Sequence, residues 1–139
     1  MRRFLVLVLV VAVVAACGGG SESTEIDPIR RGRTVYGDTC SVCHGTGGQG
    51  GVGPSLTDVV ETWPSCADHI EWVTIGSNAW KEIHGDTYGA TNRENTGAMP
   101  GQEDTMSPSD VAAVSAYERV TYGGQDRDAA LADCGIAAE

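Results

Sequence analysis

The run Cys40-Ser41-Val42-Cys43-His44 decides how this chain of 139 residues is interpreted. Two cysteines separated by two residues and followed at once by a histidine form the C-x-x-C-H pattern that attaches a c-type haem. The two thiols can add to the two vinyl groups of haem, and the adjacent imidazole can bind its iron on the proximal side. The pattern therefore predicts one covalently attached haem c held by Cys40, Cys43 and His44.

Two other chemistries also use closely spaced cysteines. A structural zinc site needs four ligands and usually a second C-x-x-C or histidine pair, and the sequence has no such pair. A thioredoxin-like redox pair would lie near a βαβ pattern, which the sequence does not show. Haem attachment is therefore the interpretation that the pattern favours.

The first sixteen residues have the form of an export signal. Arg2 and Arg3 precede an uninterrupted apolar run over residues 4–16, which is shorter than the ~20 residues that span a membrane. The sequence therefore predicts a cleaved signal peptide over residues 1–16. The junction Val14-Ala15-Ala16-Cys17 resembles the lipobox of bacterial lipoproteins, in which the cysteine is lipidated and becomes the new N-terminus. The alternative is an ordinary secretory signal followed by an unrelated cysteine.

Residues 17–27 then form the predicted lipidated cysteine and a flexible linker, because they are rich in Gly and Ser and lack apolar periodicity. We expect an extracytoplasmic bacterial protein that Cys17 anchors to the cell membrane. Loss of residues 1–16 removes two arginines and takes the net charge from −10 to −12. That charge argues against nucleic acid as a partner, which needs a basic face, and predicts redox complexes with a basic docking surface.

The residues around the haem motif resemble those of class I c-type cytochromes. Residues 32–40 are similar to the N-terminal helix of that family, in which a small residue and an aromatic one lie four positions apart. Residues 51–56 resemble its proximal loop, residues 97–100 its axial methionine segment and residues 107–117 its C-terminal helix. The resemblance extends from about residue 29 to 123. It implies a small all-α cytochrome c-like fold wrapped around one covalently bound haem.

The resemblance also implies roles for two further residues. The carbonyl of Pro54 would accept a hydrogen bond from Nδ1 of His44, which fixes the ring and raises its basicity. Met99 would be the second axial ligand of the iron, and a thioether there implies a comparatively high reduction potential.

Three other side chains remain possible ligands on the distal side, namely Met106, His69 and His84. Met106 directly precedes a predicted helix and is more typical of a hydrophobic staple. His69 falls inside a predicted helix, where an exposed or hydrogen-bonded histidine is expected. His84 lies in a stretch that is longer than a minimal cytochrome needs, so it is the strongest competitor of Met99.

Helix signals agree with this order of segments. Ser107 as N-cap, Pro108 and Asp110 predict a helix that ends before Gly123. Ser65 and Asp68 repeat the spacing and predict a middle helix that ends at Gly76. No segment alternates over enough residues to predict a strand. The expected domain covers residues 28–124, and residues 125–139 form a C-terminal tail.

Cys66 and Cys134 remain once lipid and haem have used the other three cysteines. An even remainder in an exported protein suggests a disulfide, which would tie the tail to the start of the middle helix. The alternative is two unrelated free thiols.

A haem with both axial positions filled has no open site for a substrate. The sequence therefore predicts a carrier of single electrons between respiratory complexes on the outer face of the cytoplasmic membrane, and not an enzyme. Two alternatives remain. One is a permanent haem c subunit of a larger oxidoreductase, and the other is a haem-based sensor with a labile methionine ligand.

Overall fold

The computed structural model describes residues 26–97 and 99–137 of the chain. The predicted signal peptide, Cys17 and most of the predicted linker lie outside these residues. Within them the all-α expectation is confirmed, apart from one short hairpin. The elements are α1 (Pro28–Val35), the π-helix η1 (Tyr36–Cys40), α2 (Ser41–His44), α3 (Val59–Thr62), α4 (Cys66–His84), β1 (Thr87–Tyr88), β2 (Arg93–Glu94), α5 (Pro108–Thr121) and α6 (Arg127–Asp133).

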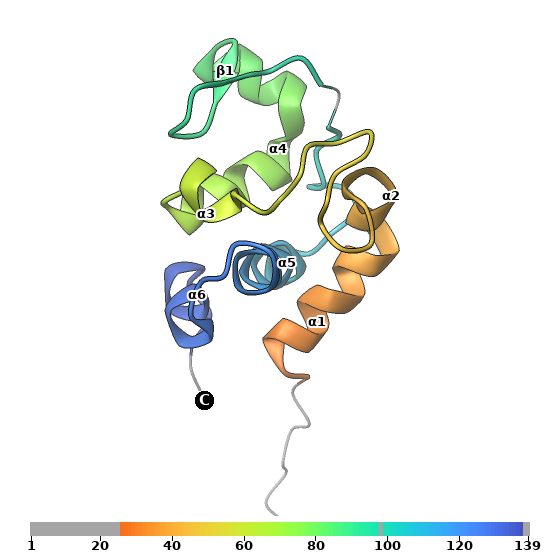
Figure 1. The fold of residues 1–139 in the computed structure, drawn as a ribbon, viewed down its shortest axis with the longest axis vertical. Helices are drawn as coiled ribbons and strands as arrows, with labels where there is room; N and C mark the ends of the chain where they lie inside the picture. The colour runs from red at the N-terminus through yellow and green to blue at the C-terminus, as the bar shows by residue number, and fades with distance from the viewer. Residues whose placement is uncertain (1–25, 98, 138–139) are drawn as a thin grey trace, which may run out of the picture.

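The N-terminal helix α1 and the C-terminal helix α5 pack directly against each other (Figure 1). Gly32 of α1 makes this approach possible, since a Cβ there would lie 2.7 Å from Cβ of Tyr117 and would also clash with the backbone of Ala113. At the edge of the contact, Nε of Arg31 donates to the Asp110 carboxylate at 2.6 Å. This crossing fixes the start of the haem motif, because η1 and α2 follow α1 without a break.

Helix α5 begins as the sequence predicts. The Oγ of Ser107 accepts a hydrogen bond from the backbone N–H of Asp110, and Pro108 occupies the first helical turn. The preceding Met106 packs against the core cluster that contains Val111. That contact is the one expected of a hydrophobic staple.

The first helical segment of α4 ends at Gly76, as predicted, but a second segment that was not predicted follows it directly. Gly76 has φ +75°, which interrupts the helix, but the chain resumes helical geometry and continues to His84. The interruption places Gly76 opposite Pro100 in an antiparallel β-bridge. A glycine in this conformation usually ends a helix. Here Gly76 joins two helical segments, and its backbone pairs with the backbone at Pro100. The two-residue hairpin of β1 and β2, which follows α4, was not predicted either.

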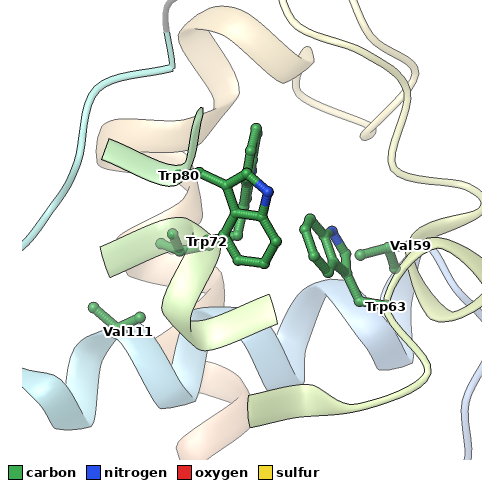
Figure 2. Close-up of a cluster of buried hydrophobic side chains, with 6 residues drawn as sticks. Val59, Trp63, Trp72, Trp80 and Val111 are labelled. Atoms are coloured by element: carbon green, nitrogen blue, oxygen red, sulfur yellow. The ribbon is translucent and has the colours of Figure 1, made fainter. Parts of the chain in front are cut away.

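Three tryptophans, Trp63, Trp72 and Trp80, form the centre of the main hydrophobic core (Figure 2). Their ring centroids lie 5.2 to 5.5 Å apart, which is the range of favourable aromatic contacts. Tyr88 of β1 stacks on Trp72 at 4.5 Å. The hairpin is therefore held to α4 by aromatic packing, and Trp63, Trp72 and Tyr88 line the cavity described below.

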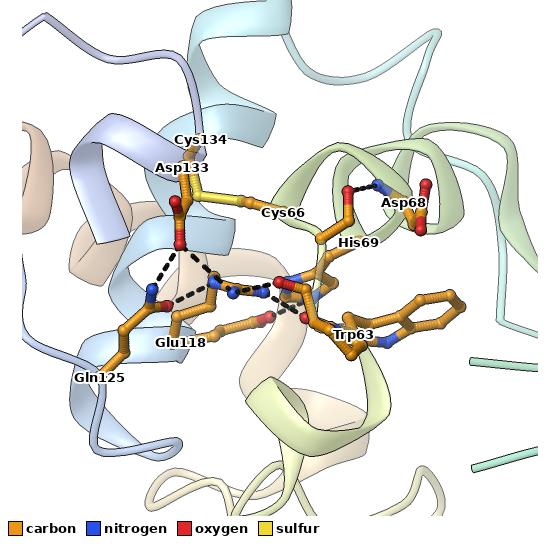
Figure 3. Close-up of a disulfide and its surroundings, with 11 residues drawn as sticks. Trp63, Cys66, Asp68, His69, Glu118, Gln125, Asp133 and Cys134 are labelled. Carbon is orange, nitrogen blue, oxygen red and sulfur yellow. Dashed lines mark hydrogen bonds and ion pairs between the residues drawn. A yellow bond between two sulfur atoms is a disulfide. The ribbon is translucent and has the colours of Figure 1, made fainter. Parts of the chain in front are cut away.

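The C-terminal tail is part of the folded unit. A disulfide joins Cys66 at the start of α4 to Cys134 at the end of α6. Beside it, the buried guanidinium of Arg119 donates to the carbonyl of Trp63 at 2.6 Å and lies 3.8 Å from the Asp133 carboxylate (Figure 3). The tail thus packs against both α5 and α4. In the part of the chain that the structure describes, no helix is both long and apolar enough to cross a bilayer.

Candidate functional site

A cavity of about 500 Å³ lies between the haem motif, α4 and the loop before α5. Its size falls in the range of cofactor sites. All five predicted haem residues line it, and Trp63, Trp72 and Tyr88 contribute aromatic side chains to its wall. The predicted residues at its surface are Cys40, Cys43, His44, Pro54 and Met99. The fold therefore brings together two segments that are 55 positions apart in the sequence.

His44 lies at the C-terminal end of α2, with its imidazole held on two sides. Its Nδ1 lies 2.9 Å from the carbonyl oxygen of Pro54, and a Cβ at Gly53 would lie 2.9 Å from Cε1 of the ring. When Nδ1 donates to Pro54, Nε2 is the nitrogen that is left to bind a metal. The backbone around the ring is fixed as well, because the N–H groups of Gly50 and Gly53 donate to the carbonyls of His44 and Cys43.

Cys40 and Cys43 are free thiols at the cavity wall. Burial raises the pKa of the Cys40 thiol to about 12, and the charges of Glu118 and Cys43 act in the same direction. A catalytic or redox-active cysteine has a lowered pKa, since the thiolate is the reactive form. The environment of Cys40 is therefore opposite to that of a thioredoxin-like pair.

The segment around Met99 is held by Ser77, which follows the interruption of α4. The backbone N–H of Ser77 donates to the carbonyl of Met99 at 2.9 Å, and its Oγ lies 3.0 Å from the Gly97 carbonyl and 3.2 Å from that of Met99. In return, the side-chain amide of Asn95 donates to the Ser77 carbonyl at 2.7 Å. No local pattern singles out Ser77 or Asn95, because both act only through contacts between distant segments.

The other three candidates for the distal ligand have different positions. Met106 does not line the cavity, and neither does His84, whose Nε2 lies 2.9 Å from the Glu71 carboxylate in an exposed pair on α4. His69 does line it, but its Nε2 lies 3.1 Å from Oε2 of Glu118. Met99 is thus the cavity-lining candidate whose side chain has no polar partner among the described residues, and its assignment as ligand stays a prediction.

Sequence reasoning named His69 as a possible distal ligand, but it missed its partner Glu118 and the Asp58–Arg93 ion pair at the cavity wall. Asp58 and Arg93 form an ion pair with 2.8 Å between the carboxylate and the guanidinium, and both line the cavity. Glu118 of α5 and His69 of α4 form the buried pair described above. No local pattern marks these residues, because each faces the cavity only through the packing of separate elements.

The residues present fit a covalently bound haem. Two thiols, an imidazole with its Nδ1 engaged and an unpaired thioether surround one cavity with aromatic walls. Among residues 26–97 and 99–137, no group of three or more His, Cys, Asp or Glu side chains could hold a metal ion directly. The geometry thus offers ligands for an iron inside a macrocycle, and it lacks the ligand set of a zinc site.

Comparison with known proteins agrees with the geometry. Residues 29–118 match the family model of cytochrome c. The chain is 31% identical over 94 residues to a protein named cbb3-type cytochrome c oxidase subunit FixP from a Bradyrhizobium species, a match that covers 67% of this chain and 30% of FixP. It is 26% identical over 101 residues to cytochrome c-L of Methylorubrum extorquens, covering 73% of this chain and 44% of that protein.

The chain therefore matches less than half the length of these curated relatives. No solved structure matches it significantly. The family model nevertheless covers the attachment motif, the proximal loop, the Met99 segment and most of α5. The chain belongs to the cytochrome c family and is an electron-transfer protein that binds one covalently attached haem c.

Proposed function

We propose that this protein is a membrane-tethered carrier of single electrons whose haem iron lies between His44 and Met99. The observation that carries the proposal is that both residues line one cavity and that hydrogen bonds hold the backbone segments on each side of it. Haem c supplies reversible one-electron chemistry when it is bound. With both axial positions filled by the protein, no position is left for a substrate, which favours electron transfer over catalysis.

The residues around the ligands keep them in place. The Pro54 carbonyl orients the His44 imidazole and raises its basicity. The two hydrogen bonds from Ser77 hold the carbonyl of Met99 against α4. A ligand set that its surroundings fix in advance changes little when the charge of the iron changes. Rapid exchange of electrons with a partner benefits from this rigidity.

The surface near the cavity suggests how a partner binds. Val42, inside the C-x-x-C run, is 80% exposed, and Val52, in the loop that follows, is 93% exposed and also lines the cavity. Such exposed apolar side chains beside a site are typical of protein contacts. Combined with the net charge of −12 that remains after loss of residues 1–16, they favour a redox partner with an apolar contact ringed by basic residues, and binding that weakens with salt.

The proposed tether begins at Cys17. Residues 18–27 would reach roughly 35 Å when fully extended, and a flexible chain of that length has an r.m.s. span of ~17 Å. A lipidated Cys17 would therefore keep the domain close to the outer face of the membrane, where respiratory complexes occur at a high effective concentration. Stable anchoring takes two or more acyl chains.

A second candidate is a permanent haem c subunit of a larger oxidoreductase. The similarity to the protein named as a cbb3-type oxidase subunit favours it. The two candidates share the haem site and differ in the lifetime of the complex that the domain forms. A mobile carrier should leave its partner after each transfer, whereas a subunit should stay bound.

The test compares the native protein with a Cys17→Ser variant, using Ser21→Ala in the linker as a matched control. We expect the native protein and Ser21→Ala to require detergent for extraction from membranes, and Cys17→Ser to be soluble or to keep its signal. A Cys17→Ser protein that is normally processed and still requires detergent would refute the lipid tether. After mild solubilisation, a carrier should migrate alone on a native gel, and stable co-migration with an oxidase would establish the subunit.

A further inference from the structure

Helix α1 carries basic side chains that take no part in the haem site. Residues 28–37 contain three arginines and no Asp or Glu. Arg30 and Arg33 are exposed, and no residue of α1 lines the haem cavity. Every other basic side chain in residues 26–97 and 99–137 has an ion-pair partner, whereas neither Arg30 nor Arg33 has one there. Two guanidinium groups on this helix are therefore available to a partner outside the chain.

The two arginines lie on the side of α1 that points away from the rest of the domain. Arg30, Arg33 and Thr34 share one face of the helix, because side chains three and four residues apart are neighbours. All three are exposed. On the opposite face, Gly32 packs against the backbone of Ala113 in α5. The outer face of α1 thus presents two arginines to solvent and no carboxylate.

The remainder of the domain is acidic. Residues 58–104, which include α3, α4 and the hairpin, contain nine Asp and Glu residues against two Lys and Arg residues. The hairpin lies at the end of the long axis opposite to the start of α1 (Figure 1). Helix α6, in which Asp128 and Asp133 are exposed, lies across α5 from α1. Positive charge is thus concentrated on one outer face of an otherwise negative domain.

This face also lies next to the proposed tether. Ile26 directly precedes Asp27, the N-cap of α1, and is 57% exposed. A chain of the length that joins Cys17 to Ile26 reaches roughly 30 Å when extended and has an r.m.s. span of ~17 Å. A lipidated Cys17 would therefore hold the start of α1 within reach of lipid headgroups. An exposed apolar side chain beside arginines is typical of segments that lie in a membrane interface.

We propose that the α1 face, formed by Arg30, Arg33 and the adjacent Ile26, binds anionic phospholipid headgroups of the membrane that carries the tether. This inference rests on the lipid anchor at Cys17 that the proposed function includes. The contact holds the domain in one orientation. The acidic region of residues 58–104, which contributes much of the lining of the haem cavity, is then turned away from the lipid surface. Redox partners reach the cavity from the aqueous side.

Charge and geometry both favour this contact. A guanidinium group matches two phosphate oxygens with paired N–H donors. Each arginine near an anionic bilayer strengthens binding roughly fivefold, so that both together contribute about 25-fold. The acidic region acts weakly at the α1 face, since charges farther apart than the Debye length of about 8 Å are largely screened. Tethering raises the local concentration of headgroups, and this modest attraction is then sufficient to orient the domain.

The test uses the haem-loaded, lipidated protein in vesicles of phosphatidylcholine alone and of phosphatidylcholine mixed with phosphatidylglycerol. Phenylglyoxal modifies accessible guanidinium groups, and mass spectrometry of the peptides then reports the reaction of each arginine. We expect Arg30 and Arg33 to react about fivefold or more slowly in the anionic vesicles, and this protection to disappear at high salt. Arg93, which pairs with Asp58 in the acidic region, is the internal control and should react equally in both.

A second measurement reports the orientation itself. Energy transfer from a fluorescent headgroup lipid to the haem depends on the height of the haem above the bilayer. For the native protein, its efficiency should differ between the two kinds of vesicle. The double variant Arg30→Gln and Arg33→Gln should lose this difference, and Arg33→Gln alone should reduce it. Lys81→Gln is the matched control, because it removes one positive charge from the acidic region, and it should keep the difference.

Equal reaction of Arg30 and Arg33 in the two kinds of vesicle, with the protein bound to both, would overturn the proposal. Protection that persists at high salt would also overturn it, because the contact would then not be electrostatic. A protein that neither kind of vesicle retains would instead refute the lipid anchor of the proposed function. In that case, coupling the Cys17 thiol of the mature protein to a maleimide lipid supplies the tether, and the same labelling experiment tests the α1 face.

Discussion

The two sides of the haem cavity are built in different ways. On the proximal side, the residues that hold His44 all lie between Cys43 and Pro54, and the hydrogen bonds among them join residues at most ten positions apart. On the distal side, Met99 is held by Ser77, which is 22 positions away, and by the bridge between Gly76 and Pro100. A short stretch of chain therefore determines the proximal ligand, whereas the distal ligand depends on the packing of α4 against the loop before α5.

This difference predicts which ligand is easier to displace. Local hydrogen bonds form as soon as the segment folds, but contacts between distant segments are lost when α4 and the loop separate. The iron should consequently keep its histidine under conditions in which it loses its methionine. Four sets of substitutions test this difference between the proximal and the distal side.

The largest effect is expected when Cys40 and Cys43 are both replaced by Ala. Without the two thiols no thioether bond can form, so haem should be absent from the protein band after denaturing electrophoresis. The control is the double variant Cys66→Ser and Cys134→Ser, which removes two cysteines outside the motif and should keep covalent haem. Retention of haem by the Cys40→Ala, Cys43→Ala protein would contradict the attachment site.

A more limited loss is expected from Gly76→Ala, which acts only on the distal side. Gly76 has φ +75°, and a Cβ there would lie 2.7 Å from the carbonyl oxygen of Met99. Strain of this kind costs more than about 1 kcal/mol, and relief requires the Met99 segment to move away. We expect haem to stay attached while the spectroscopic signature of sulfur ligation weakens or disappears.

Gly85→Ala is the matched control for this change. Gly85 also has a positive φ, of +102°, but a Cβ there would meet nothing within 4 Å. It shares the backbone strain and lacks the clash with the distal segment. If Gly85→Ala weakens sulfur ligation as much as Gly76→Ala does, the bridge between Gly76 and Pro100 does not position the ligand.

Ser77→Ala should have a smaller effect on the same segment. It removes the hydroxyl that bonds to the carbonyls of Gly97 and Met99 but leaves the backbone N–H bond in place. The expected cost is about 1–2 kcal/mol, seen as loss of sulfur ligation at a lower denaturant concentration. Ser115→Ala is the control, because Oγ of Ser115 is buried without a partner among the described residues. Equal shifts in both variants would argue against a role of Ser77 in holding Met99.

The smallest change at the haem is expected from the double variant Cys66→Ser and Cys134→Ser. The disulfide ties α6 to α4 and lies outside the ligand segments. Its loss should lower the free energy of unfolding by about 2–4 kcal/mol, as measured by denaturant titration, and leave the ligand spectrum of the folded protein unchanged. A changed haem spectrum in this variant would mean that the tail supports the site directly.

The comparison also explains which features the sequence could predict. The haem motif and the capped start of α5 at Ser107 depend on neighbouring residues, and their patterns are visible in the sequence. The hydrogen bond from His44 to Pro54 is also local, and the resemblance to class I c-type cytochromes implied it. The second helical segment of α4, beyond Gly76, could not be predicted from the sequence, since a glycine with positive φ normally ends a helix. Gly76 permits the second segment because its backbone pairs with Pro100, which belongs to a distant part of the chain.

The same reason accounts for the polar residues that sequence reasoning missed. Glu118 was not singled out, whereas His69 was expected to be exposed or hydrogen-bonded, and its Nε2 does lie 3.1 Å from Oε2 of Glu118 on another helix. Nothing in the spacing of either helix shows that their polar faces meet at the cavity. The helical form of α6 was not predicted either. The even cysteine count predicted only that the tail is tied to α4.

We expect Met99 to be the distal ligand and to complete a haem with no open position. The most direct measurement is the near-infrared spectrum of the ferric protein, in which sulfur bound to low-spin iron gives a weak charge-transfer band that a second histidine does not. Native protein and the control variant Met106→Leu should both show this band. Met99→Ala should lose it, gain an open coordination site and have a lower reduction potential, because the soft ligand that favours ferrous iron is gone. A band that persists in Met99→Ala and disappears in Met106→Leu, or its absence from the native protein, would contradict the account.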